Sequence, residues 1–213
     1  MRSRVPAACI AAAAVLLVTT TAVRGDQPPR ISFSRVFPGS TPAYIGITVD
    51  RAGAGHYREA PDDPQPVAFK LSEAEINEIF SLVDKLEHFR RPLESRLKVA
   101  FTGTKTFRLE NGGETSEVKF NFSEDLAARA LTDWFERIAE SGQHFINLER
   151  AVKYDKLGVL KAVLLLEASM DRKRLVALHQ YLPLLDRVAR NATYMHTARV
   201  RAAGIADAIR ATQ

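Results

Sequence analysis

The stretch "KTFRLENGGETSEVKFNF", residues 105–122, carries the strongest structural signal in the sequence. Its centre, Asn111-Gly112-Gly113, is a hairpin signal, because these residues readily adopt the positive φ angles that tight turns need. Apolar residues alternate with polar ones on both sides of the turn, as expected of strands with one buried face: Phe107, Leu109, Val118, Phe120 and Phe122. The stretch therefore predicts a β-hairpin with one face turned towards a core.

Three segments nearer the N-terminus predict further strands. Residues 31–37, "ISFSRVF", and residues 43–50, "AYIGITVD", place apolar side chains at alternate positions. Residues 67–71, "VAFKL", form a shorter run of the same kind. The chain up to the hairpin is punctuated by glycine and proline, which favour turns between short strands.

Two helices complete this part of the chain. Residues 71–89 repeat apolar side chains at helical spacing, and Ser72 and Glu75 form a capping box at their start. A second helix is expected after Ser123, which would cap it, and should end at Ser141-Gly142. Its apolar positions are Leu126, Ala130, Leu131, Trp134 and Ile138.

The order of these elements predicts an α+β fold for residues 26–141. Strands that follow one another along the chain favour antiparallel pairing, and helices that interrupt them pack on the sheet. We therefore expect a small antiparallel sheet with two helices on one face. An all-α helical segment, residues 142–213, should follow and dock on this domain, because only a short turn is expected between them.

The helical segment begins with a long apolar run. Asn147 is a good N-cap, and residues 148–170 read as one helix that is apolar nearly all round from Val159 to Leu166. Its length and Lys161 argue against a transmembrane span, so it should be buried. Three shorter helices are expected to cover it, with Asp171, Pro183 and Thr193 at their starts: residues 171–182, 183–191 and 193–211.

The first 25 residues have the pattern of a signal peptide. Two arginines precede an apolar run that is too short to span a membrane, and small residues stand before Asp26. Cleavage there would predict a periplasmic or secreted protein, with an uncleaved anchor as the alternative. It would also remove Cys9, the only cysteine, and three arginines, which lowers the formal net charge of +5 by three. A nucleic-acid partner is therefore not expected.

Charge differs between the two parts of the chain. Residues 26–140 contain more acidic than basic side chains, and residues 141–213 contain more basic than acidic ones. Two interpretations are open: oppositely charged parts that attract each other, which we favour, or a basic helical surface for an acidic partner.

The sequence contains no motif that indicates catalysis. None of the five histidines stands in an H-x-x-x-H pair, and there is no G-x-S-x-G elbow. We therefore expect no enzyme, no cofactor and no metal site. The alternative is an envelope enzyme with a site between the two parts, in which His144 or His179 acts as acid or base with Asp155 or Glu149.

One cluster of residues is a candidate for contact with an anion or a partner. It consists of Arg187, Arg190, His196 and Arg199, which lie near Tyr194 in the sequence. The simpler interpretation is an exposed basic helix face. Two loops rich in glycine or proline, Phe37–Ala43 and Gly53–Gln65, are candidate protein-contact surfaces.

Residues 31–140 resemble small bacterial domains of the emfourin type, which inhibit protealysin-like metalloproteases. The resemblance rests on "ISFSRVFPG", "YIGITVD", the helix from Leu71 and "LTDWFERI". It departs at Arg35-Val36-Phe37-Pro38-Gly39, where the family shows Gly-Gly-Phe after the first arginine, so no contact residue is carried over. The resemblance implies a non-enzymatic, inhibitor-like module with an extracytoplasmic protease as its partner.

These observations together predict an exported, non-enzymatic protein-binding module. Its expected partner is an extracytoplasmic protease or an envelope complex. A structural component of the envelope, with the helical tail docked on a larger complex, is the third alternative.

Overall fold

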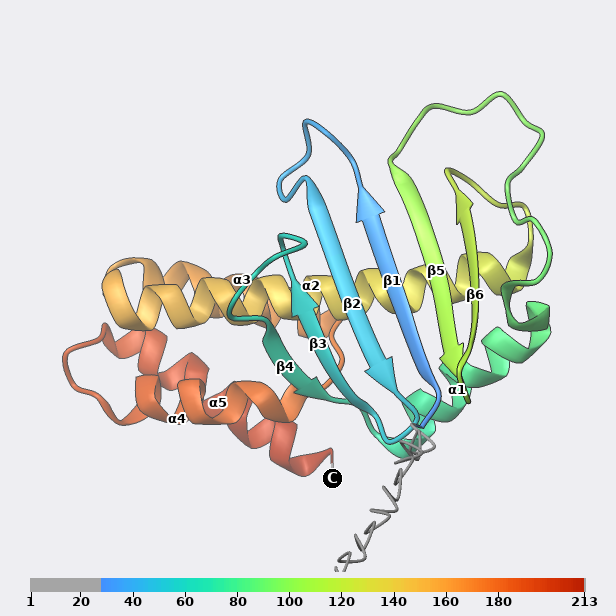
Figure 1. Cartoon of the computed structure of the whole chain (residues 1–213). Coiled ribbons are helices and arrows are strands. Elements are labelled where there is room, and N and C mark those ends of the chain that lie inside the picture. The colour runs from blue at the N-terminus through green and yellow to red at the C-terminus, as the bar shows by residue number, and fades with distance from the viewer. Residues whose placement is uncertain (1–27, 213) are drawn as a thin grey trace, which may run out of the picture.

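The computed structural model describes residues 28–212 of the 213-residue chain. One antiparallel sheet lies in front of a long helix, and a group of helices lies beside one edge of the sheet (Figure 1). The predicted signal segment, residues 1–25, lies outside the described residues.

The sheet has six strands in the order β4-β3-β2-β1-β5-β6, and every neighbouring pair is antiparallel. The predicted hairpin is confirmed, since Asn111 pairs with Glu114 across Gly112 and Gly113, which both have positive φ angles. The strands are β1 (Arg30–Val36), β2 (Tyr44–Asp50), β3 (Ala54–Arg58), β4 (Val67–Lys70), β5 (Thr104–Asn111) and β6 (Glu114–Phe120).

Strand β3 corrects the prediction that Gly53–Gln65 is an exposed loop. Its five residues pair with β2 on one side and β4 on the other. Tyr57, the fourth of these residues, is fully buried. The strand is short and begins Ala-Gly, so its own sequence has little strand propensity, and pairing with its neighbours holds it in place.

Two helices cover one face of the sheet, as predicted: α1 (Glu73–Lys85) and α2 (Leu126–Tyr154). The Ser72–Glu75 capping box is present at the start of α1. Helix α2 begins two residues later than expected, because its N-cap is Asp125 and not Ser123. The Ser123 hydroxyl instead accepts a hydrogen bond from the Asp125 amide. The α+β fold class is confirmed.

Helix α2 does not end at Ser141-Gly142, which corrects the expected helix boundary. The whole helix has 29 residues and ends at Tyr154, and Gly142 lies against the ring of Tyr57. A side chain at position 142 would overlap that ring, with its Cβ 2.4 Å from the Tyr57 Cδ1 atom. Glycine therefore serves close helix–sheet packing here and does not stop the helix.

The remaining elements form a second core around the C-terminal half of α2. Two short 3₁₀-helices are also present, η1 (Glu87–Phe89) after α1 and η2 (Leu178–Tyr181) before α4. The longer helices are α3 (Gly158–Asp171), α4 (Leu182–Arg190) and α5 (His196–Ala211). Pro183 lies in the first turn of α4, as predicted.

Four expectations for this region were wrong. Asn147 caps no helix, because it lies within α2. The single helix predicted over residues 148–170 breaks at Asp155, whose carboxylate accepts a hydrogen bond from the Gly158 amide. Asp171 ends α3 and does not start a new helix. Thr193 caps no helix, because α5 begins at His196 after Met195.

Burial of α3 is also one-sided. Leu166 is buried, whereas Leu164 and Leu165 are 39% and 48% exposed. Helix α3 is therefore amphipathic: one side of the run Val159–Leu166 is buried, and the apolar residues on its other side face solvent. The expectation of a helix buried all round was wrong. Within the part of the chain that the structure describes, no helix is both long and apolar enough to cross a membrane.

Candidate functional site

Exposed apolar side chains gather on two loops at one end of the sheet, at the top of Figure 1. The β1–β2 loop, residues 37–43, and the segment between η1 and β5, residues 90–103, meet where the rings of Phe37 and Phe101 pack edge to face, 6.0 Å apart. The apolar residues that remain exposed here are Val36, Leu97, Val99 and Phe101, and we call this surface the loop rim.

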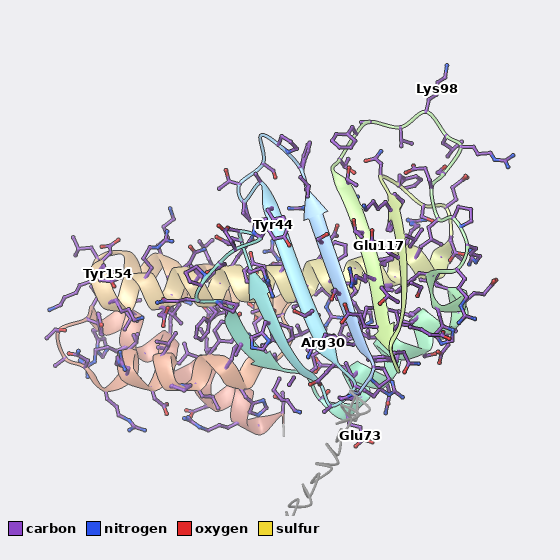
Figure 2. All side chains as sticks on the ribbon, in the orientation of Figure 1. Arg30, Tyr44, Glu73, Lys98, Glu117 and Tyr154 are labelled. Carbon is purple, nitrogen blue, oxygen red and sulfur yellow. The ribbon has the colours of Figure 1, made fainter. Side chains whose placement is uncertain are left out.

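Exposure at the loop rim is large for apolar side chains. Leu97 and Phe101 are each 56% exposed, and Val99 is 41% exposed. They alternate with Arg96 and Lys98, which are exposed and form no ion pair within the described residues. Lys98 projects away from the molecule in Figure 2. The segment thus presents apolar and cationic groups together.

The loop rim is held at its base by Asn121. The Asn121 side chain accepts a hydrogen bond from the Thr102 amide at 2.8 Å and donates one to the Ala100 carbonyl at 3.1 Å. Its backbone amide donates to a carboxylate oxygen of Glu94 at 2.6 Å. The Ser95 amide donates to the Phe122 carbonyl at 2.8 Å. The exposed residues are therefore displayed on a segment anchored at both ends.

A charged cleft lies beneath the loop rim, between the sheet and α2. Its floor is apolar, and side chains from β1, β2, α2 and the segment after α3 line an open cleft of about 390 Å³. The lining residues are Phe33, Arg35, Ile45, Glu136, Ala139, Glu140, Gln143 and Arg174. A second cavity of about 260 Å³, which also includes Lys105, adjoins it at Glu136.

Alternation along the strands explains why cations point into this cleft. Arg35 lies two residues beyond Phe33 on β1, and Lys105 lies opposite it on β5, so both face α2. The ammonium of Lys105 is mostly buried and donates to the Asn121 carbonyl at 2.8 Å and the Thr102 hydroxyl at 3.2 Å. Burial lowers the pKa of Lys105, and the nearby charge of Glu136 opposes that shift.

The carboxylates of the cleft differ in their partners. Arg174 donates to Glu140 at 3.3 Å and to Asp133 at 2.6 Å, so Glu140 is neutralised within the chain. Glu136 lies one turn earlier on α2 and faces the same cleft. Within the described residues, neither Glu136 nor Arg35 forms an ion pair or a side-chain hydrogen bond.

The acid–base pairs suggested for His144 are not formed. Asp155 accepts from the Gly158 amide, and Glu149 pairs with Lys153 at 3.0 Å. His144 instead contacts Ser169, with 3.0 Å between its Nε2 atom and the serine Oγ atom. The other suggested histidine, His179, lies in η2.

The His144–Ser169 contact does not have the geometry of a catalytic triad. Glu140 approaches the same ring nitrogen, Nε2, at 4.0 Å, whereas a triad carboxylate binds the other nitrogen. Ser169 is only 2% exposed and also accepts from Arg172. Burial lowers the pKa of His144, with Glu140 opposing and Arg172 adding to the shift. The group is a buried polar cluster that joins α2 to α3.

The predicted basic cluster lies on α4 and α5. Arg187 and Arg190 are exposed on the last turn of α4, and Arg190 approaches Asp186 at 3.5 Å. His196 is exposed at the start of α5, and the guanidinium of Arg199 donates to the Ala189 carbonyl at 3.4 Å. Two of these four side chains, Arg190 and Arg199, are therefore engaged within the chain.

Of the two loops predicted to contact a partner, 37–43 contributes to the loop rim, and Gly53–Gln65 contains β3. The segment 94–102 was missed, although its alternation of Arg96, Leu97, Lys98 and Val99 is visible in the sequence. No group of three His, Cys, Asp or Glu side chains arranged to hold a metal ion is found in the residues described.

Compared with known proteins, the chain matches no family model and no curated protein. Its fold and surface define an α+β protein with an anchored apolar loop rim above a charged cleft.

Proposed function

We propose that the protein is an exported, non-enzymatic protein-binding module that contacts its partner through the loop rim. The observation that carries the proposal is the exposure of Leu97, Val99 and Phe101 on a segment anchored by Asn121. Covering exposed apolar side chains with a partner lowers the free energy, because it removes apolar surface from water. Functional contacts also concentrate on loops held by a rigid scaffold.

The composition of the loop rim indicates the chemistry of the partner. Arg96 and Lys98 flank the apolar residues, so the complementary surface is an apolar patch bordered by carboxylates. An extracytoplasmic protease is the first partner to test, and a component of an envelope complex is the second. Anchoring lowers the entropy lost on binding, because the segment is already ordered.

Export is tested by the N-terminus of the protein recovered from the extracytoplasmic fraction. Intact-mass measurement should find a chain that begins near Asp26. A mature protein that retains Met1 and stays in the cytoplasm would contradict export without bearing on the loop rim.

Binding is tested by comparing two aspartate variants at matched exposure. Phe101→Asp changes a rim residue that is 56% exposed, and Val200→Asp changes a residue on α5 that is 55% exposed. In an inhibition assay with a protealysin-like metalloprotease, we expect Phe101→Asp to weaken inhibition at least tenfold and Val200→Asp to leave it unchanged. Equal inhibition by both variants would contradict binding through the rim.

A second measurement covers partners other than a protease. Two variants carry a photocrosslinking amino acid, one at position 99 and one at position 200. Each is expressed in the native cells, and the crosslinked adducts are compared. We expect one defined protein adduct at position 99 that excess unlabelled chain competes away. Adducts of equal yield at both positions, or none at position 99, would reject the rim as a binding surface.

A further inference from the structure

We propose that the charged cleft between the sheet and α2 binds a small zwitterion of amino-acid or dipeptide size. The proposal is independent of the loop rim, which lies outside the cleft. It rests on two oppositely charged side chains, Arg35 and Glu136, that line the same cleft. Within the described residues, they form no ion pair with each other or with any other side chain.

The two charges are partly withdrawn from water. Arg35 and Glu136 are both half-buried, one on β1 and one on α2. Desolvation of a charge is costly unless another group compensates it. Their neighbours show that the chain can form such pairs, since Arg174 binds both Asp133 and Glu140. Glu136 already interacts with the charge of Lys105 in the adjoining cavity, but it forms no direct ion pair. A ligand that carries both charges would add a direct ion-pair partner for Glu136 and for Arg35.

The charge pattern narrows the class of ligand. A simple cation would meet Arg35 and Arg174, and a simple anion would meet Glu136 and Glu140. A zwitterion avoids both conflicts, with its carboxylate on the Arg35 guanidinium and its ammonium on the Glu136 carboxylate. Gln143, which offers both a donor and an acceptor, lies beside them.

Size and polarity of the cleft agree with this class. A volume of about 390 Å³ lies near the lower end of the range for small-molecule sites. The floor of Phe33, Ile45 and Ala139 is apolar, which favours a ligand with an apolar side chain.

The test is titration of the purified, full exported chain with L-leucine and with glycyl-L-leucine, followed by amide NMR shifts and calorimetry. We expect at least one of them to bind below 10 mM with shifts centred on Arg35, Glu136 and Gln143. N-acetyl-L-leucine, which lacks the ammonium, and L-leucine methyl ester, which lacks the carboxylate, should each bind at least tenfold more weakly.

Matched variants separate this cleft from other charged surfaces. Arg35→Met and Glu136→Gln should each lower the affinity at least tenfold. Arg58 and Glu117 line a second cleft, of about 210 Å³, on the opposite face of the sheet, so Arg58→Met and Glu117→Gln should leave the affinity unchanged. Glu136→Gln keeps the size of the side chain, so it remains informative if Arg35→Met fails to fold.

Three results would overturn the proposal. They are the absence of binding by both probes at 10 mM, equal binding of the N-acetyl compound, and affinity unchanged in Glu136→Gln. Phe101→Asp should retain the zwitterion site, so a failure of the loop rim and a failure of the cleft are told apart.

Discussion

In the sheet region, residues 30–140, the N-cap residues of both long helices cap them with their side chains, whereas the N-cap residues of the helices in the helical region, residues 143–212, do not. Ser72 and Asp125 accept hydrogen bonds from the first amides of α1 and α2. Leu157, Tyr181 and Met195 stand at the corresponding positions of α3, α4 and α5, and none has a capping hydrogen bond among the described residues. Helix starts in the first region are therefore encoded locally, and those in the second are set by packing.

The largest expected effect distinguishes buried from exposed leucines on α3. Leu166→Ala should lower the free energy of unfolding by about 2–5 kcal/mol, because it leaves a cavity in the second core. Leu164→Ala removes the same atoms from a side chain that is 39% exposed and should cost less than about 0.5 kcal/mol. Urea unfolding followed by circular dichroism measures both values.

Equal losses in the two variants would show that α3 is buried on both sides in solution. A second subunit or a partner that covers Leu164 would then be required. The pair thus tests the amphipathic orientation of α3 directly.

Sequence alone predicted the sheet region well because its signals are local. Alternation along β1, β2, β5 and β6 predicted which residues face the core. The turn at Gly112-Gly113 fixed the register of β5 against β6. Strand β3 was missed because it is stabilised by a distant contact: Tyr57 packs against Gly142, which lies 85 residues away in the chain.

The helical region was predicted less well, for the same physical reason. Leu157 and Met195 provide no side-chain cap, so the residues at these positions do not mark where α3 or α5 begins. Asp155, which accepts from the Gly158 amide, is a side-chain signal near the start of α3 that the sequence analysis did not use. A run of leucines also does not show which side of the helix a neighbour covers. The candidate site shows this limit as well. Asn121 anchors the loop rim through contacts with residues 19 to 27 positions away, and no local pattern indicates them.

A smaller effect concerns the junction of the two regions. The Tyr181 hydroxyl, fully buried, donates to the Ser141 carbonyl on α2 at 2.6 Å. The Ser141 hydroxyl accepts from the Val176 amide at 2.9 Å. Tyr181→Phe should lower the free energy of unfolding by about 1–2 kcal/mol, because it removes one buried hydrogen bond.

The readout shows whether the regions unfold together. Trp134, the only tryptophan of the chain, lies in the first core, and Tyr181 lies in the second. In one cooperative transition, Tyr181→Phe shifts the midpoint of tryptophan fluorescence and that of circular dichroism by the same amount. A fluorescence midpoint that stays at its wild-type value would indicate two independent units.

The smallest effect concerns the caps that distinguish the two regions. Ser72→Ala removes the hydroxyl that accepts from the Glu75 amide and bonds the Glu75 carboxylate, and should cost about 1 kcal/mol. Thr193→Ala removes a hydroxyl that bonds no described residue, because only the Thr193 amide is engaged, with Asn191. Its expected cost is within about 0.5 kcal/mol. Thermal unfolding of the two variants beside wild type measures the difference. A larger loss in Thr193→Ala than in Ser72→Ala would mean that Thr193 caps α5 in solution, and the contrast between locally encoded and packing-determined helix starts would not hold.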